Sequence, residues 1–321
     1  MIPLRDTTPS RTFPIVNFTI IAVNVIFFII ELLQQGDLNR FFFLYGLVPA
    51  RYSVPEISQY FSLWSQIVPL FSFMFLHGGF WHLLGNMWFL YIFGDNVEDR
   101  LGPVRYLVFY LLCGWVSGVS QLLFNIESQI PTIGASGAIA GVMGAYMVLY
   151  PRSRVLTLIP IFFIPYFLEV PAAFFLGVWL LIQVISALVT DPGAPGIAWW
   201  AHIGGFLAGI LFLKVFSAVP EIGVSRKIQE TTARKSSPRL QVVKPGGDPD
   251  FYGVIDITAD EARRGARKIV NIPHGVRKRL MNVTIPPGVG DGTLLRLAGA
   301  GASADGNRRA DAFLKIRIGR G

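Results

Sequence analysis

The chain has 321 residues, of which 52% are hydrophobic and 15% charged, whereas about a quarter of an ordinary soluble domain is charged. Residues 1–217 hold 9 basic and 10 acidic side chains, and residues 218–321 hold 19 and 10. This division excludes a single soluble enzyme, a disordered chain and a fibrous repeat. The single cysteine, Cys113, excludes a disulfide scaffold and a cysteine-based metal site.

The first part of the chain contains six apolar segments, and most of them approach the length of about 20 residues that crosses a bilayer. They lie at 15–33, 67–93, 104–124, 134–150, 172–189 and 198–217. No small-residue cleavage site follows the first segment, so we interpret it as a retained anchor rather than a signal peptide. The apolar stretch 155–171 carries three prolines and is predicted to be an interfacial connection, not a seventh span.

The basic residues between these segments predict an orientation in the membrane. They cluster before the first segment and after the second, fourth and sixth, whereas the loops 125–133 and 190–197 contain none. Because Lys and Arg favour the cytoplasmic side, we expect a multi-pass protein of the cell membrane with both termini in the cytoplasm. Loop 36–65 places Arg40 and Arg51 on the outer side, and its aromatic run suggests a segment lying in the interface.

The remainder of the chain is hydrophilic and basic. Residues 218–249 contain Ser-Ser-Pro and Pro-Gly-Gly breakers and are predicted to be a linker. From about residue 250, short alternating runs separated by turn signals predict a small, mostly β domain. These runs are Lys268–Ile272, Leu280–Ile285, Leu294–Leu297 and Ala312–Ile318. We therefore expect an all-α polytopic domain over 1–217, a basic linker and a cytoplasmic β-domain over 250–321.

The basic excess of the tail is spread out and is not interleaved with exposed aromatic residues. A surface near an anionic leaflet is therefore expected instead of a nucleic-acid partner.

Polar residues inside apolar segments are costly in a bilayer, so each one suggests a function. Ser136 opens the fourth segment, and His202 is the only histidine of the sixth. A serine hydroxyl needs a base to become a nucleophile, and histidine is the usual base. Small residues follow both positions at a spacing that lets two membrane helices pack closely. The residues thus predict a Ser136–His202 dyad, because no acidic residue is well placed to orient His202.

Two further polar residues of the second segment share one face of a helix, because Asn86 lies four residues after His82. Ser136 lies at a helix start, where backbone N–H groups lack intrahelical partners and the dipole favours negative charge. An oxyanion can be held there, and each side-chain donor from His82 or Asn86 lowers the barrier by about 3 kcal/mol. The alternatives are a helix cap for Ser136, a structural histidine at 202, and interhelical polar contacts for His82 and Asn86.

Three other polar positions are predicted to be structural. His77 is expected to support the outer loop through hydrogen bonds rather than take part in catalysis. Glu98 and Arg100 are expected to form a loop salt bridge or a helix cap at the inner end of the second segment.

These residues together resemble the rhomboid family of intramembrane serine proteases. The resemblance rests on His77, His82 and Asn86, on the spacing of Gly94, Glu98 and Gly102, and on Gly134–Gly137 and Ala201–Gly205. It implies Ser136 as nucleophile, His202 as general base, and an oxyanion hole formed by His82, Asn86 and the Ser136 backbone N–H. It also implies a six-helix core open to water from the outer side. The implied substrates are single-span membrane proteins cut within or near the membrane, and no metal or cofactor is implied.

The tail is similar to the C-terminal peptide-binding domain of DnaJ-type co-chaperones. The similarity rests on Asp260–Ala262, Val283–Gly288, Asp291-Gly292, Leu295–Leu297 and Ala310–Ala312. It implies a β fold and the binding of peptide segments. A J-domain, a zinc module and a second copy of this domain, which often accompany it, have no counterpart in this sequence.

Two other functions are weighed against an intramembrane protease. One is a catalytically silent membrane protein of the same fold that binds transmembrane or misfolded clients, which the retention of both Ser136 and His202 argues against. The other is a small transporter or channel. Transporters often show inverted repeats, and no internal repeat is found here.

Overall fold

The computed structural model of the chain describes residues 1–8, 10–34, 37–161, 164–191, 196–220, 223–233, 240–242, 251–274, 277–299 and 311–319. The chain forms two compact units. One is helical and comprises Thr12–Arg152 and Pro171–Thr232. The other is rich in strands and comprises Met1–Arg11, Ser153–Val170 and Ala233–Gly321. The expected fold class, a helical membrane domain followed by a small, mostly β domain, is confirmed.

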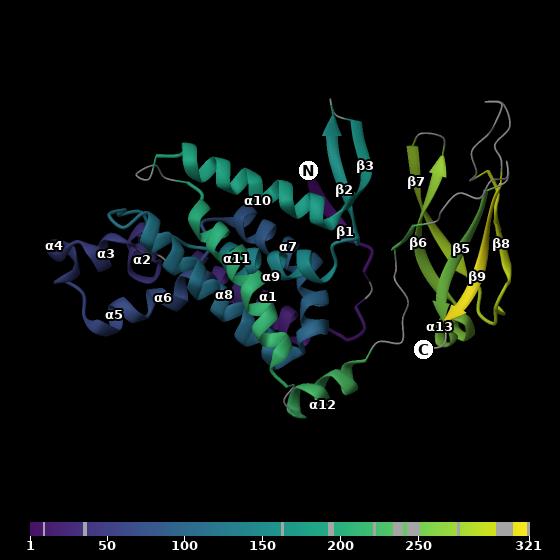
Figure 1. Ribbon diagram of the computed structural model, residues 1–321, viewed down its shortest axis with the longest axis horizontal. Coiled ribbons are helices and arrows are strands. Elements are labelled where there is room, and N and C mark those ends of the chain that lie inside the picture. Colours follow the sequence, from purple (N-terminus) through teal and green to yellow (C-terminus); the bar gives the residue numbers. More distant parts are fainter. Residues whose placement is uncertain are drawn as a thin grey trace. The chain divides into compact units, whose positions relative to one another are not determined.

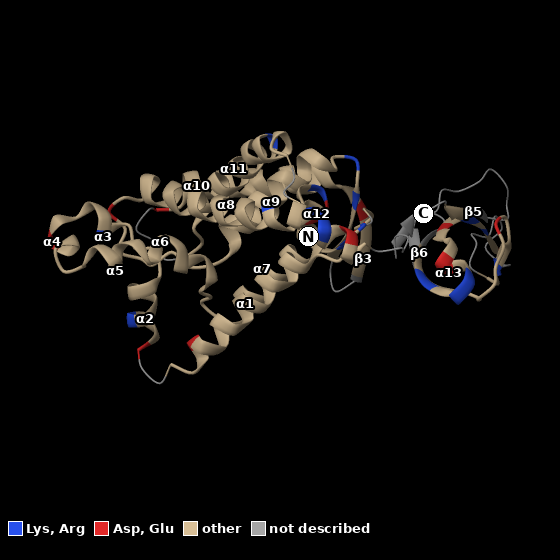
Figure 2. Ribbon diagram, turned by 90° about the horizontal axis from the view of Figure 1, so that it is seen from below, with Lys and Arg blue, Asp and Glu red and all other residues tan. Residues whose placement is uncertain are grey.

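Among the described residues, the helical unit contains six longer helices, which correspond to the six apolar segments (Figure 1). They are α1 (Ile15–Leu32), α7 (Phe80–Leu101), α8 (Pro103–Phe124), α9 (Ser136–Leu149), α10 (Ala172–Val189) and α11 (Trp199–Ala218). Figure 2 shows that these helices carry few charged side chains along their lengths. This is the charge distribution that a helix in lipid requires.

The number of spans is less regular than the sequence suggested. Among the described residues, α1, α8, α10 and α11 are each long and apolar enough to cross a membrane. A fifth candidate joins Leu63–Phe75 to α7 with a bend of 73°. Helix α9 has 14 residues, and at 1.5 Å per residue it is about 21 Å long, shorter than the hydrocarbon core. The second segment therefore begins with short helices and becomes continuous only at Phe80.

Helix α9 is the buried centre of the helical unit and packs against α7, α8, α10 and α11. Its glycines allow the backbone of α11 to approach it directly. A Cβ atom on Gly205 would collide with the carbonyl group of Gly137, and one on Gly209 would collide with that of Gly141. Because small residues alone permit this approach, the glycine spacing fixes where the first turns of α9 and α11 meet.

The N-terminal end of α1 is hydrogen-bonded to the C-terminal end of α7. The Glu98 carboxylate accepts hydrogen bonds from the backbone N–H groups of Val16 at 3.1 Å and Asn17 at 2.7 Å. Asn17 in turn donates to the Leu90 carbonyl at 3.1 Å and accepts from the Tyr106 hydroxyl at 2.7 Å. Of the two structural roles expected for Glu98, a loop salt bridge or a helix cap, the structure shows the cap, and the helix that it caps is α1.

Five short helices follow α1 and lie together at one end of the helical unit (Figure 1). They are α2 (Leu38–Tyr45), α3 (Ala50–Ser53), α4 (Pro55–Ser58), α5 (Leu63–Ile67) and α6 (Pro69–Ser72), and a 3-10 turn, η1 (Phe73–Phe75), completes the run. Arg51 is fully buried at their centre. Its guanidinium donates to the carbonyls of Phe43 and Leu44 and lies 3.8 Å from the centre of the Phe61 ring. Arg51 thus holds together the short helices of loop 36–65, the loop that we expected to lie in the membrane interface.

The described residues of the apolar stretch 155–171 form strands, not a helix. Strands β2 (Arg154–Ile161) and β3 (Ile164–Pro171) form a three-stranded sheet with β1 (Ile2–Asp6) at the chain start. Strand β1 pairs antiparallel with β2, so that Ile2 faces Leu158. The prediction that this stretch is not a seventh helical span is confirmed, but its strand structure was not anticipated.

The predicted domain boundaries, 1–217, 218–249 and 250–321, stay predictions. Within the middle range, the structure has helix α12 (Gly223–Thr232) and strand β4 (Leu240–Val242). Ala310 lies outside the described residues.

The C-terminal part contains two three-stranded sheets, ordered β5-β9-β8 and β4-β6-β7. Their strands are β5 (Phe251–Thr258), β6 (Ala266–His274), β7 (Arg277–Ile285), β8 (Leu294–Leu297) and β9 (Ala312–Gly319). We refer to residues 251–319 as the β-domain. Four of its strands match the predicted alternating runs. Strands β5 and β9 are parallel, and β6 and β7 are antiparallel.

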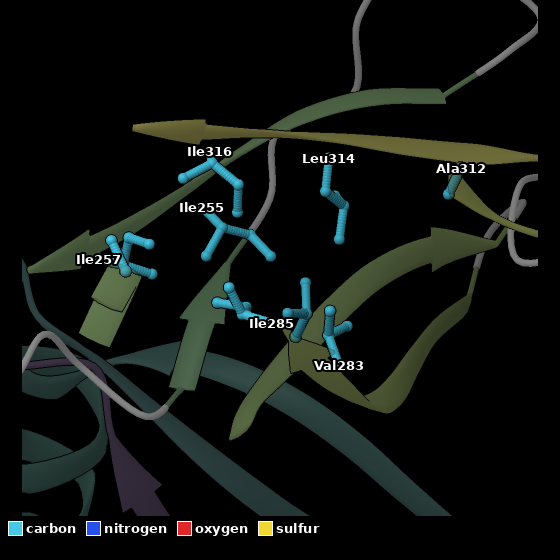
Figure 3. Packing of buried hydrophobic residues seen from close by; sticks show 9 residues of the cluster. Ile255, Ile257, Val283, Ile285, Ala312, Leu314 and Ile316 are labelled. Carbon is cyan, nitrogen blue, oxygen red and sulfur yellow. The ribbon is translucent and has the colours of Figure 1, made fainter. Parts of the chain in front are cut away.

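Alternate residues of these strands form one apolar core. Figure 3 shows Ile255, Leu314 and Ile316 pointing toward Val283 and Ile285 of the other sheet. Helix α13 (Ala259–Arg264) closes one end with a capping box, in which Thr258 and Glu261 bond reciprocally. Glu261 also accepts a hydrogen bond at 2.6 Å from Lys268, whose side chain is 1% exposed. The buried lysine is therefore paired.

Candidate active site

The structure brings Ser136 and His202 together, although 66 residues separate them in the chain. The Ser136 hydroxyl lies 2.8 Å from His202 Nε2. Ser136 is the first residue of α9, and His202 lies in the first turn of α11. The close backbone approach of these two helices, at Gly137 and Gly205, holds both first turns together. A hydroxyl at this distance from an imidazole nitrogen can transfer its proton to that nitrogen.

The second nitrogen of His202 also has a side-chain partner. His202 Nδ1 lies 2.7 Å from Oε1 of Gln183, a residue of α10 that is 5% exposed. Gln183 Nε2 donates to the Trp179 carbonyl, one turn earlier on α10, at 3.2 Å. We did not predict Gln183, because only acidic residues were considered as partners of His202. The available signal was a glutamine inside the apolar run 172–189, which needs a hydrogen-bonding partner in a bilayer.

Aromatic rings enclose the imidazole of His202. The Trp179 ring centre lies 5.7 Å from that of His202, and the Trp199 ring meets it edge-on at 6.4 Å. His202 as a whole is 9% exposed. The two tryptophan rings and the Gln183 amide together limit the orientations that the imidazole can take.

His82 lies beside the loop that leads into α9. Its Nδ1 accepts a hydrogen bond from the Gly78 backbone N–H at 3.3 Å. Because a backbone N–H can only donate, a neutral His82 carries its proton on Nε2. A Cβ atom on Gly134 would lie 2.8 Å from that nitrogen, and Gly134 has a φ of +123°, which a side chain disfavours. The Nε2–H donor therefore lies over the loop just before Ser136.

Asn86 lies one turn after His82 on α7, which packs against α9. Its side chain is 8% exposed, and among the described residues its amide Nδ2 has no hydrogen-bond partner. A buried donor without a partner costs about 1–3 kcal/mol. Such a donor on the same helical face as His82 is available to an incoming oxygen atom.

His77 lies behind His82 and does not contact Ser136 or His202 through any hydrogen bond of the described residues. Its backbone N–H donates to the Glu31 carboxylate at 3.0 Å, and its ring lies 5.2 Å from the His82 ring. This arrangement agrees with a supporting place for His77. Among the described residues, no group of three or more His, Cys, Asp or Glu side chains could hold a metal ion.

Comparison with known families gives a match in each part of the chain. Residues 64–219 match the family profile of the rhomboid domain, and residues 253–320 match that of the DnaJ C terminal domain. The rhomboid match contains Ser136, His202, His82, Asn86 and Gln183. Both resemblances drawn from the sequence are thereby confirmed, and the apolar helices mark a multi-pass membrane protein.

Individual relatives are distant. RHOMBOID-like protein 1 of Arabidopsis thaliana is 32% identical over 154 residues, which is 48% of this chain and 36% of that protein. Rhomboid protein 1, mitochondrial, of Saccharomyces cerevisiae is 25% identical over 221 residues, or 66% and 56% of the two chains. The mouse Presenilin-associated rhomboid-like protein, mitochondrial, is 28% identical over 45% of this chain and 37% of its own. The chain thus spans about a third to just over half of the length of these relatives.

Proposed function

We propose that this protein, which carries a rhomboid domain at residues 64–219 and a DnaJ C-terminal domain at residues 253–320, is an intramembrane serine endopeptidase. Its substrates are single-span membrane proteins, which it cuts within or near their transmembrane segments. The observation that carries the proposal is the distance of 2.8 Å between Ser136 Oγ and His202 Nε2.

The first step of the proposed reaction forms an acyl-enzyme. Ser136 Oγ attacks the carbonyl carbon of the scissile peptide bond while His202 Nε2 takes the hydroxyl proton. The carbonyl π electrons move onto oxygen, which gives a tetrahedral intermediate. As the intermediate collapses, the C–N bond breaks and His202 gives its proton to the leaving amine. A water molecule then repeats the sequence and releases the acyl part.

The intermediate carries a negative oxygen, for which the site has three donors. His82 Nε2–H, the Asn86 amide and the Ser136 backbone N–H at the start of α9 form the proposed oxyanion hole. The unpaired amide of Asn86 supports this assignment, because its hydrogen bond is made only when an oxygen arrives. Donors set in advance in this way are each worth about 3 kcal/mol of barrier.

The test is cleavage of a single-span reporter by the purified full chain in liposomes. Wild type should cleave, and Ser136→Ala and His202→Ala should each abolish cleavage without loss of thermal stability. Ser117→Ala is the matched control, because the hydroxyl of this buried serine donates to the Gly114 carbonyl of its own helix, α8, at 2.7 Å. A wild type that binds the reporter without cutting it would favour the alternative, a silent protein that binds membrane clients.

We also propose that the β-domain binds peptide segments of these substrates, on the strength of its family match. Both termini are placed in the cytoplasm and the chain in the cell membrane, on the distribution of Lys and Arg. Protease accessibility of a tag at each terminus, in intact and opened cells, tests the orientation. Cleavage of both tags in opened cells only would support it, and cleavage of either tag in intact cells would contradict it.

A further inference from the structure

Gln183 provides the one side-chain hydrogen bond that His202 makes apart from its bond to Ser136 among the described residues. A general base must present an unprotonated nitrogen to its nucleophile, so the tautomer of a neutral imidazole decides whether it can act. Serine proteases commonly fix that tautomer with a carboxylate, which can only accept. A glutamine amide can accept or donate, and only one of its two orientations favours catalysis.

The structure determines which orientation Gln183 takes. Its amide NH₂ group bonds to the Trp179 carbonyl at 3.2 Å, and a carbonyl oxygen can only accept. This leaves Oε1 toward His202 Nδ1 at 2.7 Å. An acceptor at that distance requires the proton on Nδ1. His202 Nε2 is then the free acceptor that faces the Ser136 hydroxyl.

We infer that Gln183 is the positioning residue of the dyad, holding His202 in the tautomer that lets Nε2 take the proton of Ser136. Through its neutral amide, Gln183 takes the orienting place that a carboxylate occupies in a triad. The inference rests on the proposed protease function. It also makes α10 part of the active site, because Gln183, the third residue of the hydrogen-bonded series Ser136–His202–Gln183, lies on that helix.

The first test uses the full chain with three substitutions. Gln183→Met keeps the length and burial of the side chain and removes the amide, so kcat should fall about 10- to 100-fold while KM stays within about twofold. Gln183→Glu keeps an acceptor at the same place and should restore most of the lost rate. Ser186→Ala is the control, since it removes a half-buried polar group three residues further along α10 and should leave kcat unchanged.

Two outcomes of this test would overturn the inference. One is a folded Gln183→Met protein with wild-type kcat. The other is a change confined to KM, which would assign Gln183 to substrate binding. Absence of cleavage by wild type would instead reject the proposed function. The second test, which does not depend on cleavage, would still show which nitrogen of His202 carries the proton.

The second test is independent of turnover and uses ¹⁵N-histidine NMR of the full chain. The chain has four histidines, so their signals can be assigned by substitution. Wild-type His202 should show a proton on Nδ1 in a strong hydrogen bond, and Gln183→Met should lose that signal. A proton on Nε2 in wild type would overturn the inference, as would an unchanged spectrum in a variant that keeps its thermal stability.

Discussion

The close approach of α9 and α11 predicts that one added methyl group will separate the dyad. A Cβ atom on Gly205 would lie 2.9 Å from the carbonyl carbon of Gly137 and nearer still to its oxygen. Carbon atoms in contact are normally about 3.5–4.0 Å apart, so Gly205→Ala requires a separation of roughly 1 Å. Gly137 directly follows Ser136, and Gly205 lies three residues after His202 on the same helix. The distance of 2.8 Å between Ser136 Oγ and His202 Nε2 would therefore grow beyond hydrogen-bond range.

A displacement of about 1 Å at reacting groups costs on the order of 100-fold in rate, which is the fall in kcat expected for Gly205→Ala. Overpacking should also destabilise the protein by about 1–3 kcal/mol. The assay is reporter cleavage in liposomes at a temperature where both proteins are folded. Gly177→Ala on α10 is the matched control, because a Cβ there meets nothing within 4 Å. A Gly205→Ala protein with wild-type kcat and stability would refute this packing.

Three further predictions concern the oxyanion donor and the β-domain. Asn86→Ala should lower kcat about 100- to 1,000-fold with little change in thermal stability, as measured by reporter cleavage, because the lost donor acts only on the intermediate. Lys268→Met should destabilise the β-domain by about 1–3 kcal/mol, measured by hydrogen exchange, because the half-buried Glu261 carboxylate loses its charged partner and keeps its bond from the Thr258 N–H. The Gly299 N–H and the Arg296 guanidinium lower the pKa of Asp311 below its ordinary 3.8. The folded β-domain is therefore stabilised by the ionised Asp311 at a pH above the pKa of this residue in the unfolded chain. This stabilisation is lost as the pH falls through the lowered pKa of the folded state. Amide hydrogen exchange of the β-domain should therefore be faster in Asp311→Asn than in wild type at neutral pH. In acid, the difference in stability between the two proteins should disappear.

The sequence predicted those structural features whose physical cause lies within a single segment of the chain. Ser136 and His202 were predictable because a polar residue in an apolar run is costly and because both precede small residues at helical spacing. The strands of the β-domain were predictable from alternation over a few residues. In each case the signal and the structure share the same stretch of sequence.

The features that the sequence analysis missed arise from contacts between distant segments. Gln183 became part of the site only when α10 packed beside α11, and a search limited to carboxylates passed over it. Strand β1 depends on a partner more than 140 residues away, since Ile2 faces Leu158. Glu98 was expected to cap a helix, but its target is α1, 82 residues earlier. Polar residues show that a partner is needed, and only the fold identifies the partner.

The most direct measurement of the central claim is covalent labelling of the full-length protein by a fluorophosphonate, with the modified residue located by mass spectrometry. The proposed dyad predicts a single label on Ser136, which should vanish in His202→Ala while thermal stability is retained. Ser117→Ala should be labelled like the wild type. Absence of labelling in a folded wild type, or equal labelling in His202→Ala, would contradict an activated serine at this site.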